Sequence, residues 1–110
     1  MTSEPLDVVI VPFPFTDRDT SRRRPALVVS SESFHTRHRQ SILAMITSTR
    51  GEWSSDVSIR RWREAGLHVP CKVRLKLFTL DESMIIRRIG RLSEEDGLAL
   101  KEALRRALVI

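Results

Sequence analysis

Lys72-Val73-Arg74-Leu75-Lys76-Leu77-Phe78 is the stretch that decides the fold of this 110-residue sequence. Apolar residues occupy every second position, and a repeat of two residues is typical of a β-strand with one buried side. The buried side would carry Val73, Leu75 and Leu77, and the opposite side Lys72, Arg74, Lys76 and Phe78. The stretch therefore predicts a half-buried strand whose second side is largely cationic.

Other short segments rich in Val, Ile and Leu predict further strands. These segments are Asp7–Phe13, Ala26–Ser30, Ser41–Thr47, Asp56–Ile59 and Met84–Ile89. The polar segment Thr16–Arg23 has no helical apolar stripe, so we expect an exposed, charged hairpin loop there. Trp62 within Arg60–Gly66 indicates a short helical turn that Gly66 ends.

A helix is expected to begin at Ser93 and to close the chain. Asp96 follows Ser93 by three residues, as in a capping box. Glu94 and Glu95 add negative charge where the helix dipole favours it. Its buried stripe would consist of Leu100, Ala103, Leu104, Ala107 and Leu108. Short strands followed by one helix predict a mainly β fold, a small antiparallel and partly closed barrel with the helix packed on it.

Length and composition limit the class of function. A chain of 110 residues with 41% hydrophobic and 30% charged residues fits one globular domain over residues 1–110. Its 19 Lys and Arg against 14 Asp and Glu give a net charge of +5, which favours a polyanionic partner. One cysteine, Cys71, excludes an internal disulfide, and no apolar run could span a bilayer. We therefore expect a cytoplasmic protein that does not engage a membrane.

The histidines and Cys71 do not predict a metal site. His35 and His38 lie in a strongly cationic stretch that would oppose a divalent cation, and His68 and Cys71 lack the paired spacing of zinc ligands. Glycine-rich phosphate loops and the serine-hydrolase motif do not occur in the sequence. We therefore expect neither a metal nor another cofactor.

Two segments near the N-terminus carry the most specific pattern. They are Asp7-Val8-Val9-Ile10-Val11-Pro12-Phe13-Pro14-Phe15-Thr16-Asp17 and Arg23-Arg24-Pro25-Ala26-Leu27-Val28-Val29-Ser30. Both resemble the opening of the MazF/PemK family of toxin endoribonucleases from toxin–antitoxin pairs. Further along, Ile46–Thr49 resembles the family's threonine-bearing strand end, and Leu77–Asp81 resembles its segment ending in Thr-hydrophobic-Asp. The resemblance extends from about Asp7 to the end of the chain.

The resemblance implies a homodimeric, SH3-like barrel of the MazF/PemK/CcdB type. It implies sequence-selective cleavage of single-stranded RNA without a metal, leaving a 2′,3′-cyclic phosphate and a 5′-hydroxyl. The family's catalytic arginine falls on Arg24 and its catalytic threonine on Thr47. Arg24 would stabilise the pentacoordinate phosphorus, and Thr47 would donate a hydrogen bond to a non-bridging oxygen. Asp81 could orient an arginine or act as a base, although a capping or turn-forming aspartate is the more common explanation.

The residues expected to bind RNA lie around these two. They are Ser21, Arg22, Arg23, Thr49, Arg74, Lys76 and Phe78. The three adjacent cations at 22–24 have a second interpretation, a solvated basic hairpin. The resemblance also implies a protein partner, a labile cognate antitoxin whose acidic, partly disordered segment would compete with RNA.

The chain departs from the family pattern at two positions. Phe78 stands where several relatives carry a functional arginine, and Leu6 stands where the family typically has glycine. Lys76 could replace part of the missing charge, and Phe78 could offer a surface on which a base stacks. The missing arginine also supports an alternative, a toxin of the same fold that binds nucleic acid or inhibits DNA gyrase without cutting RNA.

Overall fold

The computed structural model describes residues 3–12 and 22–110. Within them, antiparallel strands form one sheet in the order β4-β5-β3-β2-β1-β6. The strands are β1 (Asp7–Pro12), β2 (Arg23–Val28), β3 (Gln40–Thr47), β4 (Val57–Ser58), β5 (Lys72–Asp81) and β6 (Arg87–Arg91). The helices are α1 (Glu32–His38), α2 (Glu94–Ala107) and the short 3-10 helix η1 (Glu82–Met84).

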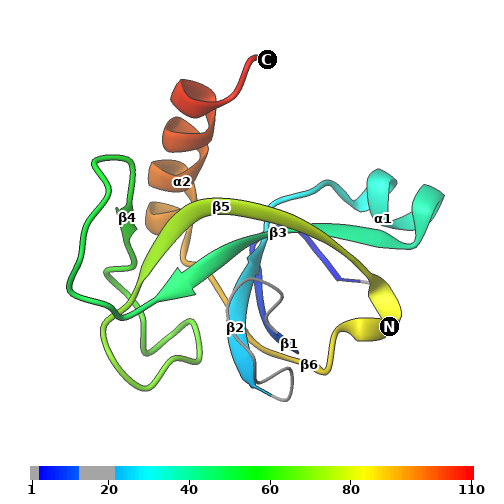
Figure 1. The fold of residues 1–110 in the computed structure, drawn as a ribbon, viewed down its shortest axis with the longest axis horizontal. Helices are drawn as coiled ribbons and strands as arrows, with labels where there is room; N and C mark the ends of the chain where they lie inside the picture. The colour runs from blue at the N-terminus through cyan, green and yellow to red at the C-terminus, as the bar shows by residue number, and fades with distance from the viewer. Residues whose placement is uncertain (1–2, 13–21) are drawn as a thin grey trace.

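The sheet curls into a half-barrel, with β5 arching over β3 and with α1 and α2 at opposite sides (Figure 1). This arrangement confirms the predicted mainly β, antiparallel fold with a helix near the C-terminus. Among the helices of residues 3–12 and 22–110, none has the length and apolar character that crossing a membrane requires.

β2 begins at Arg23 rather than at the predicted Ala26. Its first residues pair with the end of β1, so hydrogen bonding extends the strand beyond its apolar part. Arg22 precedes the strand and is exposed. Phe13 and positions 16–21 of the expected hairpin loop lie outside the described residues.

Three other strands also differ from their predicted bounds. β5 continues past Phe78 to Asp81, because it pairs with the beginning of β3. β6 begins at Arg87, since Met84 belongs to η1. Of the segment Asp56–Ile59, only the two residues of β4 form a strand.

Both α-helices begin at serine caps. The Ser93 hydroxyl accepts a hydrogen bond from the Asp96 backbone N–H at 3.1 Å, which confirms the predicted start of α2. The Ser31 hydroxyl accepts one from the Phe34 N–H at 3.2 Å at the start of α1. The sequence analysis did not predict α1, because this seven-residue helix buries only His35 and so has no apolar stripe.

The apolar residues form two clusters. The first core cluster contains Val8, Leu27, Ala44, Ile46, Ile59, Ala65, Leu67, Val73, Leu92 and Leu100. The second core cluster contains Val9, Val11, Ala26, Val28 and Leu43. β5 contributes side chains to both clusters. Leu75 and Leu77 pack against the first core cluster, and Phe78 and Leu80 pack against the second. The predicted alternation in β5 is therefore confirmed, but its second side is only partly open to solvent.

Leu6 adopts a backbone conformation that favours glycine. Its φ is 72°, in the left-handed region. Its N–H donates to the Val28 carbonyl at 2.8 Å, its carbonyl accepts from the Leu92 N–H at 3.0 Å, and its side chain packs against the first core cluster. These contacts offset the backbone strain at Leu6.

The predicted helical turn at residues 60–66 is present, and Gly66 ends it. The Leu67 N–H donates to the Trp62 carbonyl at 3.0 Å, and the Gly66 N–H donates to the Arg63 carbonyl at 3.1 Å. These two bonds, with Gly66 at φ +88°, define a Schellman motif. The chain therefore leaves the turn in a fixed direction.

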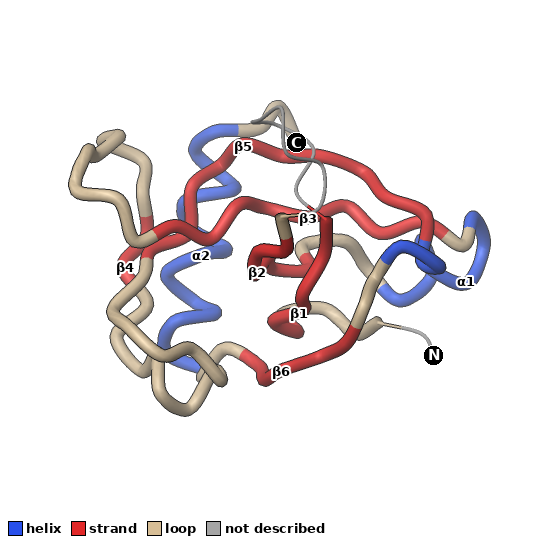
Figure 2. Tube along the Cα trace, turned by 60° about the horizontal axis from the view of Figure 1, so that its bottom comes forward, coloured by secondary structure: helices blue, strands red, loops and turns tan. Residues whose placement is uncertain are grey.

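Two contacts hold this turn against the rest of the molecule. The buried Asp96 carboxylate of α2 accepts hydrogen bonds from the backbone N–H groups of Arg60 at 3.1 Å and Arg61 at 3.0 Å. On the other side, a Cβ at Gly66 would lie 2.1 Å from the Ile89 carbonyl oxygen, so the turn touches β6 backbone to backbone. The loop that follows is consequently placed beside β6 (Figure 2).

Candidate functional site

Arg24 and Thr47 line the same cavity, of about 740 Å³, although 22 sequence positions separate them. The reason is the pairing of β2 with β3. Ala26 lies opposite Met45 in the antiparallel register. Arg24 and Thr47 each lie two residues beyond this last pair, at the same end of the two strands. We call this hollow the Arg24–Thr47 cavity.

Cationic side chains from β6 form another wall of this cavity. Arg87 and Arg88 both line it, and the sequence analysis did not single them out as site residues. The Arg88 Nε lies 2.9 Å from Oδ1 of Asp7, a carboxylate that is almost completely buried in β1. Arg88 is therefore held by an ion pair although its side chain is 46% exposed, and Arg87 is exposed as well. The only signal in the sequence was two adjacent arginines in an expected strand.

The segment after the 60–66 turn closes the cavity. Gly66, Leu67, His68, Val69 and Cys71 all line it. Their place follows from the Schellman motif and the contact with β6 described above. The described residues that line the cavity thus include three guanidinium groups, those of Arg24, Arg87 and Arg88, and the imidazole of His68. They include no carboxylate.

The Thr47 hydroxyl is held by the backbone of its own strand end. Its Oγ1 accepts a hydrogen bond from the Thr49 N–H at 3.2 Å. That bond uses a lone pair of the oxygen, so the hydroxyl hydrogen can be donated to a ligand. Thr49, an expected RNA-binding residue, is exposed and lines the Arg24–Thr47 cavity as well.

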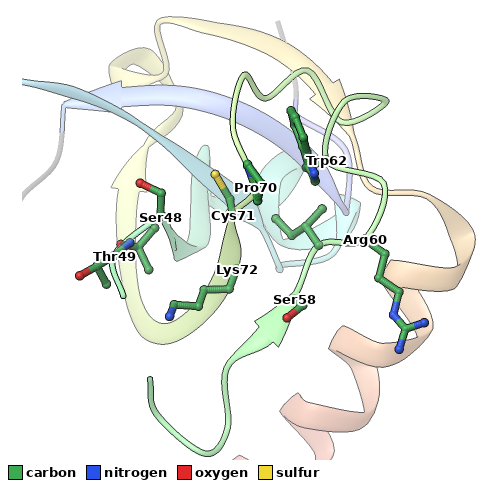
Figure 3. A pocket seen from close by; sticks show the side chains of 10 residues that line it. Ser48, Thr49, Ser58, Arg60, Trp62, Pro70, Cys71 and Lys72 are labelled. Atoms are coloured by element: carbon green, nitrogen blue, oxygen red, sulfur yellow. The ribbon is translucent and has the colours of Figure 1, made fainter. Parts of the chain in front are cut away.

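A second hollow, of about 340 Å³, adjoins the first at Thr47–Thr49 and Cys71. Figure 3 shows Lys72 and Arg60 among its lining side chains.

Cys71 lines both hollows, and its thiol is not activated. Burial raises the pKa of the Cys71 thiol, and its Sγ donates to the Val69 carbonyl at 3.2 Å. A thiol of this kind stays protonated at neutral pH and is a poor nucleophile.

Arg74 is used within the protein rather than presented to solvent. Its Nε and Nη2 donate to the two carboxylate oxygens of Asp56 at 3.1 and 2.8 Å, and Nη2 also donates to the Gly51 carbonyl at 2.8 Å. Its Cζ lies 4.9 Å from the centre of the Trp53 ring. The hydrogen bonds from Arg74, above all, hold the pKa of Asp56 below its usual value. Arg74 therefore anchors the loop at 51–56, and its role as an RNA contact stays a prediction.

Lys76 and Phe78 also lie outside the set of residues that line the Arg24–Thr47 cavity. Lys76 is exposed, with its Nζ 5.8 Å from the centre of the Trp53 ring. Phe78 pairs with Leu43 across the sheet and packs against the second core cluster. Phe78 is therefore partly buried against apolar residues, and base stacking on it stays a prediction.

Asp81 lies at the opposite end of the sheet from Thr47. In the β3–β5 ladder it pairs with Gln40, whereas Thr47 pairs with Lys72. Its Oδ1 accepts from the Ser83 N–H at 2.9 Å, and this bond is the main reason that its pKa is lowered. Asp81 caps η1, so the capping interpretation is the one the structure supports, and a single chain does not bring it to the Arg24–Thr47 cavity.

Of the three remaining residues expected to bind RNA, the structure describes two. Arg22 and Arg23 are exposed at the start of β2, next to Arg24. Ser21 lies outside the described residues.

The described histidines and carboxylates do not gather into a group of three or more that could hold a metal ion. His35 is buried, with Nδ1 donating to the Ser3 carbonyl at 2.6 Å and Nε2 within 2.5 Å of the Ser30 hydroxyl. Nδ1 thus links α1 to the N-terminal segment, and Nε2 links it to the residue that lies two positions after β2.

Comparisons with known proteins agree with this architecture. A family model described as "PemK-like, MazF-like toxin of type II toxin-antitoxin system" matches residues 4–108. The Mycobacterium tuberculosis toxin MazF-mt6 superposes with a TM-score of 0.73 at 23% identity, covering 92% of this chain and 94% of that one. A MazE–MazF structure from Deinococcus radiodurans has a TM-score of 0.74 at 17% identity, covering 96% and 94%.

A third solved structure is an endoribonuclease in complex with its cognate antitoxin from a mycobacterial species. It has a TM-score of 0.73 at 17% identity, covering 96% of this chain and 93% of that one. No curated protein sequence matches the chain. The structural likenesses confirm the half-barrel fold.

Proposed function

Because the chain belongs to the PemK-like, MazF-like family of toxins of type II toxin–antitoxin systems, we propose that it cuts single-stranded RNA in the Arg24–Thr47 cavity. One observation supports this proposal above the others: Arg24 and Thr47, distant in sequence, line one hollow together with Arg87 and Arg88. A phosphodiester is an anion, and guanidinium groups bind phosphate oxygens with matched geometry.

The reaction joins the 2′ oxygen to phosphorus and breaks the bond from phosphorus to the 5′ oxygen. Its products are a 2′,3′-cyclic phosphate and a 5′-hydroxyl. Negative charge grows on the non-bridging oxygens as phosphorus becomes pentacoordinate, so donors aimed at that position lower the barrier. Arg24 supplies a fixed positive charge, and Thr47 donates the hydroxyl hydrogen that its bond with Thr49 leaves available.

Arg87 and Arg88 are proposed to hold the phosphates beside the one that is cut. Arg88 suits this role because Asp7 fixes its guanidinium, and Arg22, Arg23 and Thr49 extend the polar surface from the neighbouring strand ends. The charge that a bound metal supplies in other nucleases would come here from side chains of the protein. We therefore expect cleavage to proceed in the presence of a chelator.

The test is incubation of the purified protein with a long, defined RNA in excess EDTA, with the ends mapped and their phosphate state determined. Cleavage at a recurring sequence with cyclic phosphate ends is the expected result. Arg24→Ala should abolish it, while Glu95→Ala, on the exposed first turn of α2, should not. Intact RNA at high protein concentration, or full activity of Arg24→Ala, would remove the proposal.

A non-cutting toxin of the same fold was favoured by Phe78 standing in place of a family arginine. Phe78 packs against the second core cluster and does not line the Arg24–Thr47 cavity. The absence of an arginine at position 78 therefore does not lower the positive charge of the residues that line this cavity. The nuclease is accordingly the better supported function, and a gyrase supercoiling assay beside the RNA assay separates the two.

We also propose a cognate antitoxin and a homodimer as the assembly in which the protein works. Solved relatives include MazE–MazF structures and an endoribonuclease bound to its cognate antitoxin. An acidic antitoxin segment laid across the guanidinium groups would compete with RNA, and such an association weakens as salt rises. Competition binding at two salt concentrations and sedimentation of the free protein test these two proposals.

A further inference from the structure

The proposed cleavage requires two proton transfers, and the residues considered so far are poorly suited to them. The 2′-hydroxyl must lose a proton and the 5′ oxygen must gain one. A guanidinium group does not give up its proton in a protein, and a threonine hydroxyl is too weak a base. The inference below rests on the proposed function and concerns the group that accepts the first proton.

His68 is carried by an anchored backbone segment at the edge of the proposed site. It lines the Arg24–Thr47 cavity, and its side chain is exposed. The preceding residue, Leu67, is only 7% exposed and is fixed by its hydrogen bond to the Trp62 carbonyl. The contact of Gly66 with Ile89 holds the same segment against β6. His68 therefore lines the cavity from a backbone segment that is anchored on two sides.

The other titratable or charged residues that line the cavity leave few alternatives. They are Arg24 from β2, Arg87 and Arg88 from β6, and Cys71 just before β5. The three guanidinium groups keep their protons, and burial raises the pKa of Cys71, so that thiol is protonated at neutral pH. Among the described residues that line the cavity, an imidazole alone can both accept and release a proton near neutrality.

We propose that His68 is the general base of RNA cleavage by this protein. Neutral imidazole is the form of this side chain that can accept a proton. It accepts the proton of the 2′-hydroxyl as the 2′ oxygen bonds to phosphorus. The electron pair of the breaking bond goes to the 5′ oxygen, which takes a proton from solvent water. The imidazolium then returns its proton to solvent, so protons balance over the cycle.

The principal experiment measures single-turnover cleavage of a fixed RNA between pH 5 and pH 9. For the unaltered protein the rate should rise with pH and level off, as expected when the neutral base is the active form. His68→Gln should lower the plateau by about 10²- to 10⁴-fold, the usual contribution of a positioned acid or base, and should remove the acidic limb. His38→Gln is the matched control, because His38 is exposed on α1 and does not line the cavity.

A second measurement separates proton transfer from a purely structural role. His68→Ala should regain part of its activity when free imidazole is added to the buffer, and the regained rate should increase with the concentration of neutral imidazole. Circular dichroism of each variant confirms that the fold is retained. A variant with a lower rate but an unaltered pH profile and no rescue by imidazole overturns the assignment of His68.

The outcomes also distinguish this inference from the function on which it rests. If the unaltered protein does not cut RNA, the proposed function fails. If it cuts RNA and depends on Arg24, but His68→Gln keeps the full rate and the acidic limb, only the inference about His68 fails.

Discussion

Replacing Asp96 by alanine removes the carboxylate that ties the 60–66 turn to α2. Its two oxygens accept hydrogen bonds from the N–H groups of Arg60 and Arg61, and the residue is 2% exposed. A donor left without a partner costs about 1–3 kcal/mol, so two cost about 2–6 kcal/mol. Water reaches part of this contact, and we therefore expect the free energy of unfolding to fall by about 2–4 kcal/mol. At about 4 °C per kcal/mol, the melting temperature should fall by about 8–16 °C.

Urea unfolding followed by circular dichroism measures this loss, and Glu95→Ala is the matched control. Glu95 is exposed in the same first turn of α2, so its removal should cost about 0.3–1 kcal/mol through the helix dipole. Asp96→Asn retains one acceptor oxygen and should fall between the two alanine variants. The reasoning is refuted if Asp96→Ala is no less stable than Glu95→Ala.

The other predictions concern packing, pH and catalysis. A Cβ at Gly90 would lie 2.1 Å from the Ala65 carbonyl oxygen, so Gly90→Ala should destabilise the protein by about 1–3 kcal/mol, whereas Gly51→Ala, with open space around it, should be near neutral in thermal unfolding. The pKa of Asp56 is lower in the folded state, so the stability it contributes is complete above the unfolded pKa near 4 and should be lost as the pH falls through the lowered value; Asp56→Asn should flatten this part of a stability-against-pH curve. Thr47→Ala should lower the cleavage rate about 10²- to 10³-fold with little change in RNA affinity, and an equal loss in both would contradict its role as a donor in the transition state.

Patterns that act over a few residues were sufficient for much of the fold. The alternation in β5 placed Leu75 and Leu77 on the side of the first core cluster, and the cap at Ser93 marked the start of α2. These features are local, because a strand repeats every two residues and a helix cap acts within one turn. The short helix α1 was not predicted, because it has a serine cap but no repeat of apolar residues.

The site could be predicted only in part. Arg24 and Thr47 were assigned through a family resemblance, and the structure then placed both on one cavity. Arg74 was expected on a cationic surface, but its partner Asp56 is 18 positions away in the sequence, so the alternation of β5 gave no sign of the ion pair. Asp81 was separated from the cavity by the length of β3, a distance that only strand pairing reveals.

The sequence by itself determined most of the strands, the start of α2 and a positive net charge, because each depends on residue type and short-range spacing. Tertiary structure decided which charged side chains line the Arg24–Thr47 cavity and which lie elsewhere in the fold. Arg88 and His68 meet Arg24 there because strand register and the close approach of Gly66 to Ile89 bring distant segments together. The proximity of residues that are distant in the sequence depends on the paths of several backbone segments at once. No single stretch of sequence encodes those paths.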